Sequence, residues 1–221
     1  MVMQDQAFRD GEGDRWWYRN RKALETAAGH DWPLMLIQRH SLAPKAVIEF
    51  GCADGWRLAE IQRQYGAHID CYGVDASGAA IQEGQARYHG LLLFEGLASY
   101  VPWLPNEVAD LGIIHFVLHW VDRRRLFATI AEIDRLIKPG GHLIIADFLP
   151  STPTKVPYHH QEGLWTWKEN YAGYFTAGGM YKDGEAVVFD HSKRLPSWED
   201  IPKHDRAICV LLQKGDWYKC E

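Results

Sequence analysis

The segment Glu49–Gly55, with the sequence EFGCADG, combines an acidic residue with small residues at the spacing of a ligand-binding turn. It follows a short apolar run, Ala46–Phe50, and precedes a helical pattern, Arg57–Ile61. Small residues let the backbone approach a ligand, and the first N–H groups of a helix are free to bind it. A second apolar run, Ile69–Val74, ends in Asp75, whose carboxylate suits both hydroxyls of a ribose. Together these features predict a site for a nucleoside cofactor.

Apolar runs and amphipathic segments alternate through the middle of the chain. The expected strands are Ala46–Phe50, Ile69–Val74, Leu91–Glu95, Ala109–Ile114 and His142–Asp147. The expected helices are Arg15–Ala28, Trp32–His40, Gly55–Gln64, Gly78–Tyr88 and Arg123–Ile137. The expected N-caps are Asp31 for Trp32–His40, Ser77 for Gly78–Tyr88 and Asp122 for Arg123–Ile137. Continuous apolar strands separated by helices predict a parallel sheet that is covered on both faces. Pro139-Gly140-Gly141 is expected to end the last helix.

The pattern changes after this region. Leu149–Lys182 is rich in aromatic residues and lacks periodicity, whereas Glu185–Asp190 and Arg206–Gln213 read as an antiparallel hairpin at one edge of the sheet. The predicted fold is α/β, with a Rossmann-like seven-stranded sheet, mostly parallel, an antiparallel C-terminal edge hairpin and helices on both faces. We expect one domain over 1–221, divided into an N-terminal helical cap (1–43), a cofactor-binding core (44–148), an aromatic-rich substrate lid (149–184) and C-terminal strands (185–221).

Composition narrows the range of partners. The net charge is −5 and no basic stripe is visible, which disfavours a nucleic-acid partner, although net charge does not report a local basic groove. No apolar run approaches the roughly 20 residues of a membrane span, and the polar N-terminus is not typical of a signal peptide. The four cysteines form no CxxC pair and the histidines show no HExxH spacing. We therefore expect a cytoplasmic protein that binds neither membrane nor metal.

Two cofactor classes compete for the turn. A dinucleotide fingerprint needs a third small residue that packs helix against strand, and Trp56 occupies that position. The spacing acidic-x-Gly-x-small-x-Gly fits without strain. The spacing alone favours a nucleoside cofactor other than a dinucleotide. It leaves open both a nicotinamide-dependent oxidoreductase and a turn that binds no ligand.

Four ordered segments make the preference specific. Val47–Gly55, Cys71–Ser77, Asp110–Val121 and Leu136–Asp147 resemble, in this order, the motifs of class I S-adenosylmethionine-dependent methyltransferases. The resemblance covers about Pro44–Pro150 and implies S-adenosyl-L-methionine as cofactor and S-adenosyl-L-homocysteine as product. The chain departs from the family at Ala53, where glycine is usual. We expect this change to cost little unless the backbone φ angle there must be positive.

The resemblance also implies which residues contact the cofactor. The expected set is Glu49, Gly51, Cys52, Ala53 and Gly55 in the turn, Asp75 at the ribose, Ala76, Leu97 and Ala98 at the adenine, and His115 and Phe116 facing the sulfonium. From the N-terminal side, the segment Trp16–Asn20 is expected to close over the cofactor through Tyr18, Arg19 and Asn20, with Arg19 paired to the methionine carboxylate. The alternative for this segment is a helix that only docks on the sheet.

Segments on either side of Pro44–Pro150 suggest a narrower family. Gly13-Asp14, Arg19-Asn20, Pro157-Tyr158 and Glu162–Trp165 resemble segments of the methylases associated with pseudaminic acid biosynthesis. That resemblance implies a sugar or a sugar-derived acid as substrate. The aromatic residues of 149–184 agree with such a lid, because rings stack on sugars and planar metabolites, but they also suit a small cap with its own core.

Methyl transfer to a hydroxyl or an ammonium benefits from a general base. The candidates are His119, His115 and His160, since imidazole titrates near neutral pH. The alternatives are that His119 binds a backbone carbonyl in a short turn, that His115 lines the cofactor pocket, and that His160 lies on a surface loop. The predicted function is methyl transfer to oxygen or nitrogen of a small molecule. A nicotinamide-dependent oxidoreductase and a non-catalytic accessory protein are the alternatives.

Overall fold

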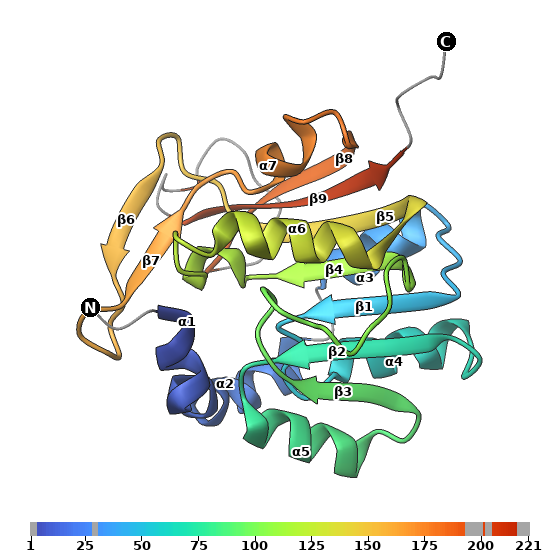
Figure 1. Ribbon diagram of the computed structural model, residues 1–221, viewed down its shortest axis with the longest axis horizontal. Coiled ribbons are helices and arrows are strands. Elements are labelled where there is room, and N and C mark those ends of the chain that lie inside the picture. Colours follow the sequence, from blue (N-terminus) through green and yellow to red (C-terminus); the bar gives the residue numbers. More distant parts are fainter. Residues whose placement is uncertain (1–3, 28–30, 193–200, 202–204, 216–221) are drawn as a thin grey trace.

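The computed structural model describes residues 4–27, 31–192, 201 and 205–215. Its centre is a seven-stranded sheet in the order β3-β2-β1-β4-β5-β9-β8 (Figure 1). The strands are β1 Ala46–Phe50, β2 Asp70–Asp75, β3 Leu91–Glu95, β4 Ala109–His115, β5 Ile137–Phe148, β8 Tyr181–Asp190 and β9 Arg206–Lys214. Strands β1 to β5 are parallel, and β9 runs antiparallel to both of its neighbours, β5 and β8. The predicted fold class is confirmed.

Helices cover both faces of the sheet. Helices α3 (Trp32–Arg39), α4 (Trp56–Tyr65) and α5 (Gly78–Arg87) pack on one face through a core that includes Ile37, Leu58 and Ile81. Helices α6 (Leu126–Leu136) and α7 (Ala172–Thr176) contribute to the opposite core. Continuous burial along β1, from Ala46 to Phe50, explains its unbroken apolar sequence.

Two of the predicted helix caps are confirmed. The Asp31 carboxylate accepts from Leu34 N at 3.0 Å, and Ser77 Oγ accepts from Ala80 N at 3.0 Å. Asp122 does not cap α6, because that helix begins only at Leu126. The Asp122 carboxylate instead accepts from the Gln4 and Arg124 backbone amides, each at 3.0 Å. It therefore ties the N-terminal segment to the turn before α6.

The Pro139-Gly140-Gly141 turn lies inside a strand, which corrects the prediction that it ends the helix. Helix α6 runs directly into β5 at Ile137, and the pairing with β4 shifts register between Ile137 and His142. Gly140 has a φ of +77°, a backbone conformation that glycine adopts readily. The turn is therefore a bulge in β5.

Residues 149–182 are more ordered than their sequence suggests. Strands β6 (Thr154–Pro157) and β7 (Trp165–Lys168) form a separate two-stranded antiparallel sheet, α7 follows, and β8 begins at Tyr181, four residues before its predicted start. The N-terminal segment comprises α1 (Gln4–Ala7), η1 (Phe8–Glu12) and α2 (Gly13–Ala27), and α1 lies beside the β6–β7 hairpin (Figure 1). Among the described residues, no helix is both long and apolar enough to span a membrane.

Candidate functional site

The loop after β1 has a backbone that favours glycine. Gly51, Ala53 and Gly55 have φ angles of +72°, +52° and +80°. The amides of Gly51 and Cys52 both donate to Val74 O, at 2.7 and 3.2 Å, which ties the loop to β2. A Cβ atom added to Gly51 would lie 2.2 Å from Val117 Cγ2. The loop thus combines left-handed residues with a close contact to the segment after β4.

Asp75 lies at the end of β2 and fixes this loop. Its Oδ2 accepts from Ala53 N at 2.8 Å, and its Oδ1 accepts from Ser77 N at 2.8 Å. Burial raises the pKa of this carboxyl above its usual value. Because each carboxylate oxygen has two lone pairs, both oxygens keep room for a further donor. This geometry suits the predicted contact to two ribose hydroxyls.

A buried ion cluster lies beneath the loop. Arg57 on α4 pairs with Asp31, with Nη2 2.8 Å from Oδ2, and with Glu49 Oε1 on β1. Glu49 Oε2 is buried and has no hydrogen-bond partner among the described residues. Burial raises the pKa of Glu49 to about 7, despite the nearby guanidinium. For Asp31, burial is outweighed by Arg57, which lowers the pKa. Two carboxylates therefore share one cation.

Helix α2 packs directly on the loop. A Cβ atom on Gly13 would lie 3.0 Å from the Ala76 carbonyl carbon, and Asp14 Oδ1 accepts from Ala79 N at 3.0 Å. The buried Trp17 packs with Ala53 and Ala80, and its indole Nε1 has no partner among the described residues. The residue that covers the loop from this side is thus Trp17.

Tyr18, Arg19 and Asn20, which are expected to close over the cofactor, have partners within the protein. Tyr18 is 57% exposed, and its ring lies 5.4 Å from the Arg21 guanidinium carbon. Arg19 pairs with the fully buried Glu12 and donates to Tyr158 Oη at 3.0 Å. Asn20 Nδ2 donates to Trp16 O, one helical turn back, at 2.8 Å. Because an unpaired buried charge is costly, Glu12 is a strong partner for Arg19, and a contact between Arg19 and the methionine carboxylate stays a prediction.

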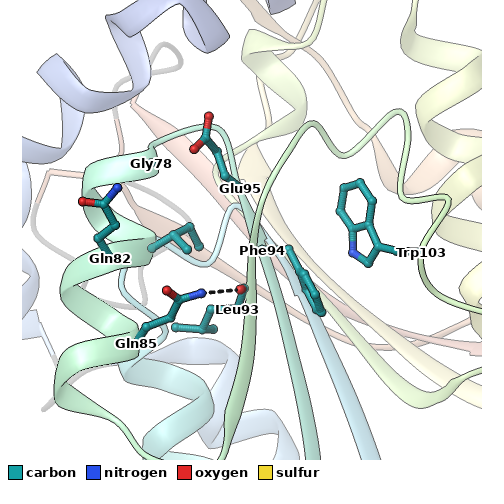
Figure 2. A pocket seen from close by; sticks show the side chains of 8 residues that line it. Gly78, Gln82, Gln85, Leu93, Phe94, Glu95 and Trp103 are labelled. Carbon is teal, nitrogen blue, oxygen red and sulfur yellow. Dashed lines mark hydrogen bonds between the residues drawn. The ribbon is translucent and has the colours of Figure 1, made fainter.

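The loop after β3 lies beside Asp75, since Gly96 N donates to Asp75 O at 2.8 Å. This contact places Leu97 and Ala98 near the predicted ribose site, as the adenine assignment requires. A neighbouring cavity of about 340 Å³ opens between α5 and β3, where Glu95, Gln82 and Trp103 line its walls (Figure 2). None of the predicted cofactor residues lines this cavity, so it is distinct from the predicted site.

His119 and Asp147 meet at the carboxyl ends of β4 and β5. His119 lies on the short turn η3 (Leu118–Trp120), and its Nδ1 is 2.9 Å from Asp147 Oδ1. Phe148 N donates to the same oxygen at 2.8 Å. An ionised carboxylate only accepts, so we assign the proton to Nδ1 and a lone pair to Nε2. The side chains are 2% and 1% exposed.

Aromatic rings surround this pair. The His119 ring centroid lies 4.3 Å from Trp120 and 5.0 Å from Phe148. Phe116 follows β4 with a φ of +57°, which is unusual for a bulky residue, and its amide donates to Ala146 O at 2.8 Å. His115 ends β4 with its ring 5.0 Å from that of Phe116. The two residues expected to face the sulfonium thus adjoin the His119–Asp147 pair.

His160 does not join this pair. It is exposed in the turn between β6 and β7, and its ring lies 5.4 Å from that of Tyr158. Its assignment as a base is therefore not supported. Sequence reasoning predicted a strand that ends at Asp147 but not the pairing of Asp147 with His119, and it missed the Glu12–Tyr158 contact. No group of three metal-ligating side chains occurs in the part of the chain that the structure describes.

Comparison with known proteins finds relatives of the central part of the chain. Residues 48–145 match the model of a methyltransferase domain. A malonyl-[acyl-carrier protein] O-methyltransferase of Alcanivorax borkumensis is 28% identical over 133 residues, 58% of this chain and 43% of the relative. A phthiotriol/phenolphthiotriol dimycocerosates methyltransferase of Mycobacterium leprae is 32% identical over 114 residues, 50% and 40% of the two chains. The chain spans less than half the length of these curated relatives.

Solved structures share the fold. The 1,6-didemethyltoxoflavin-N1-methyltransferase of Burkholderia thailandensis aligns with a TM-score of 0.72 at 13% identity, covering 96% of this chain and 89% of its own. A SAM-dependent methyltransferase of Aquifex aeolicus aligns with a TM-score of 0.60 at 15% identity, covering 86% and 93%. At these identities the likeness concerns the fold alone. The match to a methyltransferase domain thus covers residues 48–145, a little less than half of this chain, and the fold around it is one that these methyltransferase structures share.

Proposed function

We propose that this protein transfers the methyl group of S-adenosyl-L-methionine to an oxygen or nitrogen atom of a small molecule, with His119 as general base. The observation that carries the proposal is the His119–Asp147 pair beside a nucleoside-binding loop. A buried imidazole held by a carboxylate is an arrangement suited to taking a proton from an acceptor.

The residues present fit the cofactor. Asp75 keeps acceptor capacity on both carboxylate oxygens for a ribose, and Gly51 leaves room where a Cβ atom would collide with Val117. Glu49 Oε2 is a buried acceptor without a partner among the described residues, which suits the ammonium group of the methionine part. When bound, S-adenosylmethionine supplies the electrophilic methyl group and a good leaving group.

The protein supplies position and proton transfer. Asp147 holds Nδ1–H of His119, so that Nε2 can accept the proton of an acceptor hydroxyl or ammonium group. The bound proton then makes the imidazole cationic, and the neighbouring carboxylate stabilises that charge. Aromatic rings around His119 keep water away and favour a planar or ring-containing acceptor.

The acceptor itself stays a proposal. The Alcanivorax relative is named for malonyl-[acyl-carrier protein], the Mycobacterium relative for phthiotriol dimycocerosates and the Burkholderia structure for 1,6-didemethyltoxoflavin. These names do not select one substrate class. The resemblance to pseudaminic acid methylases, with a sugar-derived acid as acceptor, remains a prediction, as do the cytoplasmic location and the absence of a nucleic-acid partner.

Two experiments test the proposal. Calorimetric titration of the full chain with S-adenosylhomocysteine should give saturable binding, and no heat at millimolar ligand would exclude the cofactor. Incubation with methyl-labelled S-adenosylmethionine and a small-molecule extract should label an acceptor. The variant His119→Gln should then lose about 10²–10⁴-fold in turnover. His160→Gln, at the exposed histidine, is the matched control and should keep wild-type turnover.

The alternatives give different results. Protection against heat by NADH, but not by S-adenosylhomocysteine, would favour an oxidoreductase. Cofactor binding without labelling of any extract component would favour a non-catalytic accessory protein, which the intact His119–Asp147 pair argues against.

A further inference from the structure

The turn that carries His119 is short and needs support from outside. Residues Leu118–Trp120 form a single 3₁₀ turn, and a turn of this length leaves most of its carbonyl groups without a partner in the turn itself. We propose that Arg123 is a positioning residue for His119, holding this turn and fastening it to the β7–α7 segment. The inference rests on the proposed role of His119 as base.

The Arg123 guanidinium satisfies carbonyl groups on both sides of His119. Nη2 donates to Leu118 O at 2.7 Å and to Val121 O at 3.0 Å. The Arg123 Nε donates to Val121 O as well, at 3.3 Å. Because these carbonyls flank His119, they fix the backbone from which the imidazole projects. The planar guanidinium is suited to this task, since its donors have a fixed geometry.

The opposite edge of the same guanidinium contacts the segment that runs from β7 to α7. Nη1 forms an ion pair with Glu169, and Glu169 Oε2 also accepts from Tyr174 Oη at 2.7 Å. The guanidinium carbon lies 5.4 Å from the ring centroids of both Trp167 and Tyr171. Arg123 and Glu169 side chains are 22% and 17% exposed, so solvent screens this pair less than a surface pair. The Arg123 guanidinium is therefore held by the carbonyl groups of the His119 turn, by Glu169 and by two aromatic rings.

This arrangement bears on the base, because Asp147 and Arg123 both hold His119. Asp147 Oδ1 binds Nδ1 and its Oδ2 accepts from the His119 amide at 3.3 Å, while Arg123 binds the backbone carbonyls of Leu118 and Val121. A general base must reach its proton at hydrogen-bond distance, so loss of either support moves Nε2 out of position. Trp120 Nε1 adds a bond to Thr166 Oγ1 at 3.2 Å, which also joins η3 to β7.

The neighbouring arginine provides the matched control. Arg124 pairs with Asp122, with Nη2 3.0 Å from Oδ2, and its side chain is 57% exposed. Among the described residues, Arg124 has no hydrogen bond or ion pair with η3. Arg123→Met and Arg124→Met thus remove the same charge and the same donors from adjacent positions, but only the first removes the support of the His119 turn.

The test needs no acceptor substrate. Histidine-¹⁵N NMR of the full chain, saturated with S-adenosylhomocysteine where it binds, reports the tautomer of each ring, and His119→Gln assigns the His119 signals. We expect wild-type His119 to show a slowly exchanging Nδ1–H and an unprotonated Nε2. Arg123→Met should lose the Nδ1–H signal, whereas Arg124→Met should retain it.

The possible outcomes separate the claims. Identical His119 spectra in Arg123→Met and Arg124→Met would overturn the inference. If circular dichroism shows that Arg123→Met does not fold, Arg123→Lys is measured in its place. The lysine ammonium can reach only some of the carbonyl groups that Arg123 binds, so an unchanged Nδ1–H signal in Arg123→Lys also overturns the inference. An absent Nδ1–H signal in the wild type would instead refute the His119–Asp147 pairing. Missing heat with S-adenosylhomocysteine would refute the proposed cofactor and leave the role of Arg123 standing.

Discussion

Asp75 on β2 and Ala53 in the loop after β1 are joined by a 2.8 Å hydrogen bond from the Ala53 amide to the Asp75 carboxylate. This bond fixes the relative position of the two segments that are expected to hold the methionine and ribose parts of the cofactor. The site is therefore shaped by a contact within the protein before any ligand arrives, as preorganised sites are.

Asp75→Asn should weaken S-adenosylhomocysteine binding. The amide keeps the shape of the side chain but offers one acceptor oxygen in place of two, so one donor is left unpaired. We expect a loss of about 1–3 kcal/mol, or roughly 5- to 150-fold in Kd. Calorimetric titration with S-adenosylhomocysteine measures this change in Kd. The control is Asp70→Asn, at an exposed aspartate at the other end of β2. Equal affinities in the two variants would contradict the ribose assignment.

Glu49→Gln should change how stability depends on pH. Burial raises the pKa of Glu49 from 4.5 to about 7, so the folded state binds its proton more tightly than the unfolded state. The contribution of this group to the free energy of unfolding is therefore fully present below about pH 4.5 and is lost as pH rises to about 7. Urea unfolding of wild type should show this fall, by up to about 3 kcal/mol, and the variant should lack it. Parallel pH profiles for the two proteins would contradict the prediction.

Tyr158→Phe should loosen the N-terminal segment. The phenol donates to the buried Glu12 Oε1 at 2.7 Å and accepts from Arg19. Its loss leaves a buried carboxylate with one donor fewer, which costs about 1–3 kcal/mol. Hydrogen exchange over residues 4–12 should accelerate. Tyr100→Phe, at a 64% exposed tyrosine, should change neither exchange nor stability.

Gly51→Ala and Gly179→Ala form a matched pair. Their φ angles are +72° and +70°, so both substitutions add the strain of a left-handed residue, about 1–2 kcal/mol. At Gly51 the new methyl also collides with Val117, whereas nothing lies within 4 Å at Gly179. Urea unfolding should show a larger loss for Gly51→Ala, accompanied by weaker cofactor binding. Equal losses would mean that the loop opens to admit the methyl group.

The inner strands could be predicted because they are buried on both faces, as β1 is, and the half-buried edge strand β3 because its run of apolar residues is unbroken. Strand β1 spans the predicted residues Ala46–Phe50, and β3 spans Leu91–Glu95. The β6–β7 hairpin escaped prediction because its four-residue strands are only partly buried and depend on tertiary partners such as Gln4. Local sequence carries no signal for contacts of that separation.

Spacing along the chain indicated the loop after β1 and Asp75 as candidates for the cofactor site, and in the structure the bond from Ala53 N to Asp75 Oδ2 joins them. The partner of Arg19 could not be predicted, because Glu12 lies in a polar stretch whose burial only the fold reveals. Ala53 shows the same limit: its φ of +52° meets the condition under which alanine is costly, and the strain of about 1–2 kcal/mol could not be read from the residue type.

The place of β9 also governs how the chain is assembled during synthesis. Strand β9 lies between β5 and β8, yet it is the last of the three to leave the ribosome. Until residues 206–214 emerge, the edge of β5 that faces away from β4 has no partner strand, and β8 has no strand to pair with. A nascent chain that stalls before this point exposes two open strand edges, which is a typical origin of aggregation.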